Sequence, residues 1–545
     1  MPSTPTTKSQ VQAYQFVLRR MQSALVRRDA VMLHDPMRTH TRATIVGVVL
    51  GMLGMLGFLI VGLLNPKPTP PDSGIVIGEQ SGAVFVKTAN PPKLIPVFNL
   101  ASARLLLMAQ QQQQGGQGAP AQSSGAKVED PKVVPDEQLK DITRGKMTGI
   151  IDGPQLLPNK DQRVSDDWGV CDLTKIDPSL PSQVGLEQAT TETTVFAGVP
   201  NLGRELGQEE SLLVTADNGQ SYLIYRQENN VNRTSANAVR ARVDLSKPAV
   251  AVALQLNKQK SRRISTGLLN AIPEVGELKA PVIPNKGQRP ATFTVSQSLM
   301  IGQVFATTRV GGQDAWAILP NGVQQVSAAV ADLLLAENSG GRVGALPEVS
   351  LDKLQQLPLI QAGTPGALAV EDYPKSVPTT LEPALTPLTC LGWNIVNKGT
   401  PNEDGHTAVF VGSQLPGPKN AQGQSQAMPL SQPGPDGFKI NGFYLQPGRG
   451  AVVRAATSKE SFNSGQISLV SDRGLRYGVP DVNTANGLGL TDPRPAPEAI
   501  IRLLPTGASL NTGDVQKSYD SVPTDPKAGS FPTPAPQAAG APSGN

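Results

Sequence analysis

Histidine, cysteine and aromatic side chains are scarce in this sequence. Its 545 residues include three histidines and two cysteines, and aromatic residues make up 4%. A zinc site needs clustered cysteine and histidine ligands, and the sequence contains no such cluster. His406 is the only histidine beyond residue 42, so a Ser or Cys triad would depend on it alone. The surrounding segment Asn402-Glu-Asp-Gly-His406 predicts a polar turn rather than a catalytic base.

Motifs for phosphate binding and nucleophilic catalysis are also missing. A Walker A loop needs Gly-Lys followed by Ser or Thr, whereas the only Gly-Lys pair, Gly145-Lys146, precedes Met147. The Gly-x-Ser-x-Gly elbow of serine hydrolases lacks its closing glycine after Gly219, Gly423 and Gly507. The inventory points away from an enzyme. We expect no catalytic residue, no metal ligand and no cofactor.

One long segment without a charged side chain runs from Ala43 to Leu64. At about 1.5 Å rise per residue, a helix of this length covers the roughly 30 Å hydrocarbon core of a bilayer. A signal peptide predicts a shorter apolar core, of about 7 to 15 residues, and a small-x-small cleavage site. Here Asn65-Pro-Lys-Pro68 follows instead. We therefore expect a transmembrane helix, in preference to a signal peptide or a buried core helix.

The distribution of charge predicts the orientation of this helix. Residues 1–42 contain seven basic and two acidic side chains, a net +5, so the whole-chain charge of +4 leaves −1 beyond the anchor. Positively charged flanks stay in the cytoplasm. We expect the N-terminus inside and about 480 residues outside. The alkaline pI is then a signal of topology, and it does not indicate a nucleic-acid surface.

The N-terminal segment predicts an amphipathic helix. One face carries apolar residues spaced by three and four positions, while Arg20 and Arg27 fall on the opposite face and Arg19 on the flank. The helix could lie on the anionic inner leaflet or dock against a cytoplasmic partner, and the pattern alone does not separate the two. The apolar positions are Val11, Tyr14, Leu18, Met21 and Leu25.

The outer portion combines many turns with a repeated pattern. Glycine and proline together are 103 of 545 residues, which predicts short elements in an α+β fold rather than long bundled helices. A strand, a turn, a second strand and a helix recur in four ordered copies, which indicates internal repeats. The strand pairs and following helices are 83–87, 94–98 and 100–108; 211–215, 222–225 and 236–243; 303–307, 315–319 and 323–336; and 466–470, 476–479 and 483–490.

Two blocks outside the repeats each contain one cysteine. Cys171 and Cys390 lie on the outer side of the membrane, where disulfides persist, and their even count leaves no orphan thiol. A redox pair or a metal site is disfavoured, because there is no C-x-x-C and no neighbouring histidine. We expect a structural disulfide, and we expect the two blocks to pair as a central β-rich domain.

These patterns divide the chain into a cytoplasmic helix, an anchor, four ββα-type repeat domains around a central β-rich domain, and a tail. The glutamine-rich tract 110–125 and the Pro/Ala/Gly tail predict disorder. The expected boundaries are 1–42, cytoplasmic docking helix; 43–64, transmembrane helix; 65–163, linker and repeat domain 1; 164–207, central domain, first part; 208–297, repeat domain 2; 298–386, repeat domain 3; 387–457, central domain, second part; 458–520, repeat domain 4; and 521–545, tail.

Longer motifs distributed along the chain resemble one family. They lie before the anchor, in the first repeat, around the first cysteine and in the later repeats. Together they resemble EccB, the membrane-anchored component of the type VII (ESX) secretion system of mycobacteria and related actinobacteria. The motifs are Thr6-Thr-Lys-x-Gln-Val11, Phe16-x-Leu-Arg-Arg20, Val26-Arg-Arg-Asp29, Asp35-Pro36, Phe98-Asn-Leu-Ala-Ser-Ala-Arg-Leu105, Trp168-Gly-Val-Cys-Asp172, Leu319-Pro-Asn-Gly322, Arg476-Tyr-Gly-Val-Pro480 and Leu488-Gly-Leu490.

The resemblance implies a place in a membrane complex. It implies four repeat domains around a central domain and a disulfide that transfers onto Cys171 and Cys390. It also implies as partners the motor ATPase EccC, EccD, EccE, a mycosin protease and further EccB copies, in a hexameric ring in the inner membrane with the outer portion periplasmic. The N-terminal helix then becomes a docking element. Within the anchor, Gly47, Gly51 and Gly54 would allow close packing against partner helices.

Three functions follow as hypotheses. The first is a structural and assembly subunit that forms a periplasmic scaffold around the translocation path. The second is an ATPase, a label that some family members carry and that no motif here supports. The third is a peptidoglycan-binding module, suggested by the repeated outer domains.

Overall fold

The computed structural model describes residues 7–28, 36–64, 68–114, 130–177, 179–180, 182–227 and 238–521. The chain forms two compact units, Met1–Pro70 and Pro71–Asn545. The tail beyond residue 521 and positions 115–125 of the predicted glutamine-rich insert lie outside the described residues. Residues 110–114 continue the helix that precedes them, in agreement with the helix propensity of glutamine.

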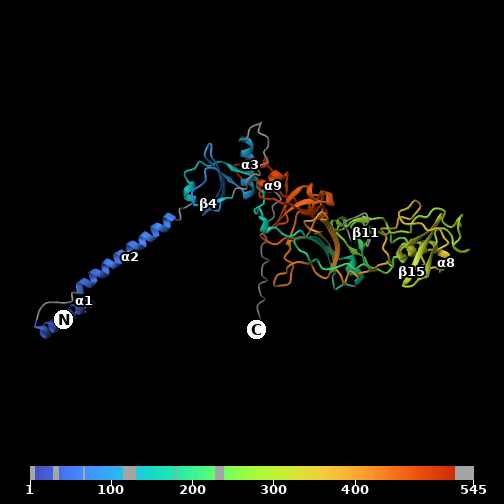
Figure 1. Ribbon diagram of the computed structural model, residues 1–545, viewed down its shortest axis with the longest axis horizontal. Coiled ribbons are helices and arrows are strands. Elements are labelled where there is room, and N and C mark those ends of the chain that lie inside the picture. Colours follow the sequence, from blue (N-terminus) through green and yellow to red (C-terminus); the bar gives the residue numbers. More distant parts are fainter. Residues whose placement is uncertain are drawn as a thin grey trace, which may run out of the picture. The chain divides into compact units, whose positions relative to one another are not determined.

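The first unit consists of two helices, α1 (Lys8–Arg27) and α2 (Pro36–Leu64) (Figure 1). Within α2, His40–Leu63 is the one stretch of the described residues that is long and apolar enough to cross a membrane. Its side chains between Ile45 and Leu63 are exposed. An apolar helix of this length with exposed side chains suits a lipid-embedded span.

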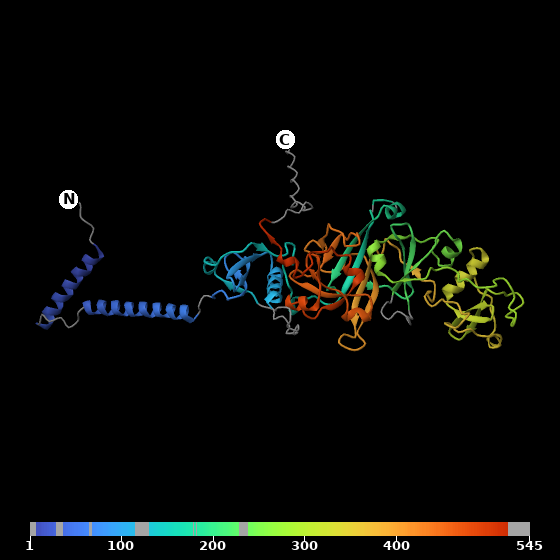
Figure 2. The ribbon, with the colours of Figure 1, turned by 90° about the horizontal axis from the view of Figure 1, so that it is seen from above.

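The second unit is built around a seven-stranded sheet, which we call the central sheet. Its strand order is β20-β21-β7-β6-β18-β19-β8. Strands from two distant parts of the sequence lie side by side in it. The teal strands near residue 170 run beside the orange ones near residue 390 (Figure 2). The strands are β6 (Trp168–Lys175), β7 (Thr190–Ala197), β8 (Arg204–Glu205), β18 (Leu388–Val396), β19 (Asp404–Gly412), β20 (Met428–Pro429) and β21 (Gly442–Tyr444).

Four antiparallel three-stranded meanders, each followed by a helix, make up most of the remainder. In every meander consecutive strands pair, so each is a local unit of low contact order. They are β1 (Gly74–Gly78), β2 (Val84–Thr88), β3 (Lys93–Val97) with α3 (Leu100–Gln114); β9 (Glu210–Thr215), β10 (Ser221–Arg226), β11 (Ala238–Arg242) with α5 (Pro248–Ala253); β14 (Val304–Arg309), β15 (Gly312–Leu319), β16 (Gly322–Val326) with α7 (Ala328–Ser339); and β22 (Gly450–Ala456), β23 (Ile467–Ser471), β24 (Arg476–Val479) with α9 (Val482–Gly487).

Short strands extend three of these meanders, and short helices lie between them. In the first sheet, β26 from the C-terminal end of the described chain pairs with β5, opposite the β4 edge. The further strands are β4 (Lys132–Val134), β5 (Met147–Thr148), β12 (Arg262–Arg263), β13 (Glu274–Val275), β17 (Thr379–Thr380), β25 (Arg494–Pro497) and β26 (Ser518–Tyr519). The further helices are α4 (Ser182–Glu187), α6 (Thr266–Ala271), α8 (Leu351–Leu354) and α10 (Glu498–Ile501).

The two-strand pattern predicted for the repeats is therefore incomplete. The helix predicted over 236–243 is wrong where the structure describes it, because residues 238–242 form β11. Val239 and Ala241 are buried while Arg240 and Arg242 alternate with them, which is the period of a strand. Likewise the helix predicted from Val323 begins only at Ala328. Residues 322–326 form β16, and the Ser327 hydroxyl caps Val330 N–H at 3.2 Å.

Meander helices pack in pairs across the sequence. Ala101, Leu105 and Met108 of α3 share one buried cluster with Ala485 of α9 and its neighbour Leu488. In the same way, Val250 of α5 packs in one cluster with Leu333 and Ala336 of α7. The first meander thus packs on the fourth, and the second on the third. The strand β22 also lies inside the predicted block 387–457, yet it pairs with β23 of the fourth meander.

Candidate functional site

The apolar face predicted on the N-terminal helix lies on α1. The backbone N–H of Thr7 donates to Oε1 of Gln10 at 3.0 Å, which stabilises the start of the helix. Tyr14 is 67% exposed and Leu25 80% exposed, and the described part of α1 buries no residue. The face comprises Val11, Tyr14, Leu18, Met21 and Leu25, and Arg19, Arg20 and Arg27 are exposed beside or opposite it. Five apolar side chains on one face give this helix a surface that a membrane or a protein would cover.

The three predicted packing glycines lie on one face of α2. Gly47, Gly51 and Gly54 are spaced by four and three residues, and a Cβ atom built on any of them would meet nothing within 4 Å. Their face is therefore open to a neighbouring helix. Whether a helix packs there stays a prediction.

The two cysteines are joined by a disulfide in the middle of the central sheet. Cys171 of β6 and Cys390 of β18 lie directly opposite each other, with their Cα atoms 4.0 Å apart, and both are fully buried. They link segments 219 positions apart. The sequence predicted this bridge and the pairing of the two blocks that contain it.

A buried carboxylate adjoins the disulfide. Asp172, which follows Cys171, is 2% exposed and accepts hydrogen bonds from Ser265 N–H at 2.7 Å, Ser265 Oγ at 2.9 Å and Thr193 Oγ1 at 2.8 Å. Ser265 in turn caps α6 by accepting from Leu268 N–H. Burial raises the pKa of Asp172 to about 6, against the three hydrogen bonds, which lower it. This carboxylate therefore holds α6 of the second meander region onto the central sheet.

A buried arginine makes the reciprocal link. Arg262 of β12 is 2% exposed, and its guanidinium donates to the carbonyls of Leu381 and Thr386 and to the hydroxyls of Thr386 and Thr389. Burial lowers the pKa of Arg262 to about 10. Four acceptors around one guanidinium tie the segment that enters β18 to the second meander. Asp172 and Arg262 thus both join the central sheet to the second meander region. Asp172 belongs to the central sheet, and Arg262 belongs to the second meander region.

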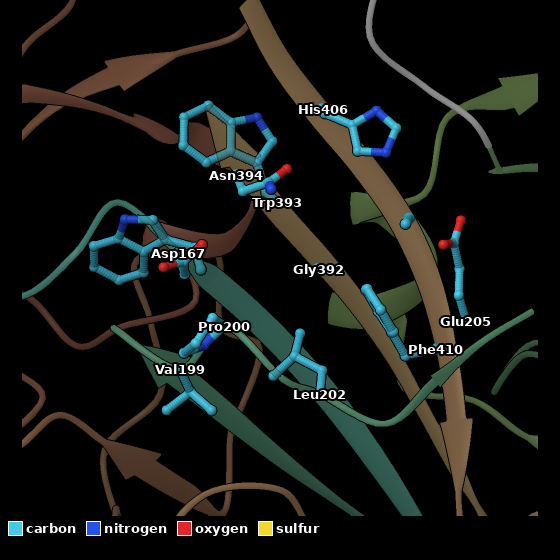
Figure 3. A pocket seen from close by; sticks show the side chains of 12 residues that line it. Asp167, Val199, Pro200, Leu202, Glu205, Gly392, Trp393, Asn394, His406 and Phe410 are labelled. Carbon is cyan, nitrogen blue, oxygen red and sulfur yellow. The ribbon is translucent and has the colours of Figure 1, made fainter. Parts of the chain in front are cut away.

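A hollow of about 250 Å³ lies at one end of the central sheet (Figure 3). Polar side chains of Asp167, Asn394, His406 and Glu205 surround one part of it, and Val199, Leu202 and Phe410 the other. Trp168 and Trp393 also border it. We call this cavity the acidic hollow, because its lining has two carboxylates and neither lysine nor arginine among the described residues.

His406 lies in this hollow and not in the polar turn that the sequence predicted. It belongs to β19 and faces Asn394 across the β18–β19 ladder. The prediction failed because Asp404 and Gly405, which resemble turn residues, are the first residues of a strand. Burial lowers the pKa of His406. Among the described residues, the lining of the hollow includes no serine, cysteine or threonine that His406 could activate.

Several residues of this region were not singled out from the sequence. Asp172 stands within the strand Trp168-Gly-Val-Cys-Asp-Leu173, and a charge in an apolar strand is a signal that could have been used. Arg262 gives no such signal, because Arg262-Arg263 resembles an exposed basic pair. Within the described ranges, no group of three or more His, Cys, Asp and Glu side chains is arranged to hold a metal ion.

Nearly the whole chain matches one protein family. The family model described as "Type VII secretion system ESX-1, transport TM domain B" matches residues 3–524. Among curated proteins, the chain is 29% identical to the "ESX-3 secretion system ATPase EccB3" of Mycolicibacterium smegmatis, over 95% of this chain and 92% of that protein. It is 28% identical to the "ESX-5 secretion system ATPase EccB5" of Mycobacterium tuberculosis, over 95% of each chain.

Two solved structures share the fold. One is a chain of an intact ESX-5 inner membrane complex, with a TM-score of 0.65 and 25% identity, covering 98% of this chain and 99% of that one. The other is the EccB3 dimer from the ESX-3 core complex, with a TM-score of 0.63 and 25% identity, covering 82% of this chain and 100% of that one.

Proposed function

Because this chain belongs to the EccB family of type VII (ESX) secretion systems, we propose that it is a structural subunit of an ESX secretion complex. The observation that carries this function is the family match over residues 3–524, which includes the membrane helix and the outer portion together. Similar chains have been solved as part of an ESX-5 inner membrane complex, over 98% of this chain, and as an ESX-3 EccB dimer, over 82% of it. The chain is thus a membrane component that associates with other ESX components and with its own kind.

The subunit spans the inner membrane once. Its α2 provides a single apolar helix, and the β-rich α+β portion follows it. The net +5 charge of residues 1–42 supports a cytoplasmic N-terminus and a periplasmic bulk. In this orientation the disulfide Cys171–Cys390 lies in a compartment where it persists.

The periplasmic portion is a scaffold of four repeat domains around a central domain. Four meander-plus-helix units support this division, as do the paired clusters of α3 with α9 and of α5 with α7. The central sheet contributes one face to a large core shared with residues of the second and fourth meanders, such as Leu212 and Val453. A rigid scaffold of this kind would surround the translocation path.

Specific partners follow from the family's known composition. We assign the motor ATPase EccC, EccD, EccE and a mycosin protease as neighbours, with further copies of this chain in a hexameric ring. The exposed apolar face of α1 would dock against a cytoplasmic partner, and the Gly47–Gly51–Gly54 face of α2 against a partner helix.

The names of two relatives, EccB3 of Mycolicibacterium smegmatis and EccB5 of Mycobacterium tuberculosis, include the word ATPase. This chain has no Walker A sequence, and the assembly function does not require ATP turnover by this subunit. Purified full-length chain, free of motor protein, should therefore release phosphate from ATP no faster than buffer. Turnover that co-purifies with the chain and persists after removal of the motor protein would reinstate the ATPase hypothesis.

The docking assignment is tested by charge insertion on α1. Tyr14→Asp with Leu18→Asp places two charges on the apolar face, whereas Ser23→Asp places one charge on the opposite face. In membranes that contain all ESX components, we expect the first variant to lose EccC and EccD from an affinity purification, and the second to retain them. Equal recovery from both variants would contradict docking through this face.

A further inference from the structure

The two faces of the central sheet differ in what covers them. On one face, Val170, Leu391 and Val409 pack into the large core with residues of the second and fourth meanders. On the other face, Cys171 and Cys390 pack with Phe196, Leu202 and Leu415, which come from the sheet and its own connecting segments. Among the described residues, this second face is therefore covered by local segments only. We call it the open face.

One segment divides the open face into two cavities. Val199, Pro200 and Leu202 line both the acidic hollow and a neighbouring cavity of about 650 Å³. Leu202 rests on two facing glycines, because a Cβ on Gly169 or Gly392 would lie 2.5 Å or 3.0 Å from its Cδ1 atom. Small residues beneath this side chain thus let the segment lie flat on the sheet and leave a hollow on each side.

The two cavities carry opposite charge. The larger one is lined by Arg204 and Lys419 and by no acidic residue among those described, so we call it the basic hollow. Glu210 pairs with Arg204 from outside this lining, with Oε2 at 2.7 Å from Nη1. Lys419, whose Nζ donates to Oε1 of Gln414, is the cation of this lining that has no ion pair among the described residues.

In the acidic hollow, Glu205 forms an ion pair with Arg226, which lies outside the lining. Nη2 of Arg226 is 3.1 Å from the carboxylate of Glu205. Asp167 has no ion pair within the described part of the chain and accepts one hydrogen bond, from Ser165 Oγ at 2.6 Å. A carboxylate without an ion-pair partner suits an ammonium or guanidinium group.

We propose that the open face binds an extended segment of a partner protein, with a lysine or arginine side chain in the acidic hollow and an acidic side chain in the basic hollow. The apolar ridge of Pro200 and Leu202 between the hollows would contact the part of the segment that joins the two charges. Opposite charges at the two ends set the direction of the bound segment. This inference rests on the proposed assembly function and names a surface and a binding chemistry for it.

The basic side chain is tested with a small probe. Full-length chain in detergent is titrated with N-acetyl-arginine amide and followed by tryptophan fluorescence, since Trp168 and Trp393 line the hollow. We expect saturable binding that weakens by about tenfold or more in the Asp167→Asn variant. Asn394→Lys, which places a cation at the exposed rim without touching the carboxylates, should weaken it similarly. Glu209→Gln, an exposed acid outside the hollow, should leave binding unchanged. A signal that is not saturable, or that N-acetyl-leucine amide reproduces, would overturn the proposal.

The protein segment is tested in the assembled complex. A photo-crosslinking amino acid replaces Asn394 at the rim of the hollow, and Asn218, in the exposed turn after β9, serves as control. We expect a crosslink from position 394, and none from position 218, to a protein other than this chain. The crosslinked peptide of that protein should contain a lysine or an arginine. A product with a second copy of this chain, with a peptide lacking basic residues, or with glycan would contradict the proposal, as would no product. Purification of the intact complex tests the assembly function separately. If the complex is intact but the crosslink is contrary, the binding proposal fails and the assembly function stands.

Discussion

Ser265 donates two hydrogen bonds to Asp172, one from its backbone N–H and one from its hydroxyl, although 93 positions separate the residues. Asp172 belongs to the central sheet, and Ser265 caps the first turn of α6 beside the second meander. A single buried carboxylate therefore defines how these two parts meet. A scaffold subunit needs such fixed joints, because partners recognise the spacing between its surfaces.

Removing this carboxylate should weaken the fold. Asp172→Ala would leave the N–H and hydroxyl of Ser265 and the hydroxyl of Thr193 without their acceptor in a buried site. We expect a loss of about 2 to 4 kcal/mol in the free energy of unfolding. Denaturant unfolding of the full-length chain below pH 6, where the folded chain keeps Asp172 protonated, measures it. The control variant Glu209→Ala, at an exposed position, should change stability by less than about 0.5 kcal/mol. An equally small effect of Asp172→Ala would contradict the claim that Asp172 stabilises the contact between the central sheet and α6.

The same residue predicts a dependence of stability on pH. Its pKa of about 6 in the folded chain exceeds its value of 3.8 in the unfolded chain, so the folded state binds more protons between these values. Stability from this group is full below pH 3.8 and is lost as the pH rises through 6. Relative to Asp172→Asn, the native chain should lose roughly 3 kcal/mol across this window. Parallel curves for the two proteins between pH 4 and 6.5 would show that Asp172 does not titrate there.

The disulfide should stabilise the joint between the two blocks of the central sheet. Replacing Cys171 and Cys390 together by alanine removes a crosslink that closes a loop of more than 200 residues. We expect a cost of about 2 to 5 kcal/mol in the free energy of unfolding. A reductant should lower the stability of the native chain by a similar amount and leave the double variant unchanged. If the reductant also destabilised the double variant, its effect on the native chain would not come from the disulfide.

The packing of the first meander on the fourth can be measured as a coupling. A Cβ on Gly487 would overlap Sδ of Met108, so Gly487→Ala forces that side chain aside. We expect Gly487→Ala to destabilise by about 1 to 3 kcal/mol, and Met108→Ala to relieve about 1 kcal/mol of this cost in a double-mutant cycle.

Gly276→Ala is the matched control for this coupling, because open space surrounds that glycine. The control should be near neutral in stability. Strictly additive effects of the substitutions at Met108 and Gly487 would argue against their contact.

The sequence predicted the features that depend on local pattern. The uninterrupted apolar run identified the span now seen within α2, and the hairpins at 211–225 and 303–319 follow from alternating strands around turn residues. The third strand of the second meander was missed, because Ala238–Arg242 consists mostly of alanine and arginine, which are good helix formers. It is a strand because it pairs with β10, the preceding strand, and the composition of the segment alone does not reveal that pairing.

The candidate site was less accessible from the sequence. Asp172, Arg262 and the acidic hollow each combine residues from segments far apart in the chain, and their burial depends on how the meanders pack. The cysteine pair was predictable because parity and compartment constrain it without any knowledge of packing. His406 was misplaced for the opposite reason, since Asp404-Gly405 has the composition of a turn and the conformation of a strand.

The central claim, that this chain is a structural subunit of a membrane secretion complex, is tested most directly by its state in the native membrane. Affinity-tagged full-length chain would be extracted in mild detergent and weighed by native mass spectrometry, with subunits identified from the same sample. The account predicts a defined assembly that contains several copies of this chain together with other ESX components. A chain that emerges only as a monomer, without companion subunits, would contradict it.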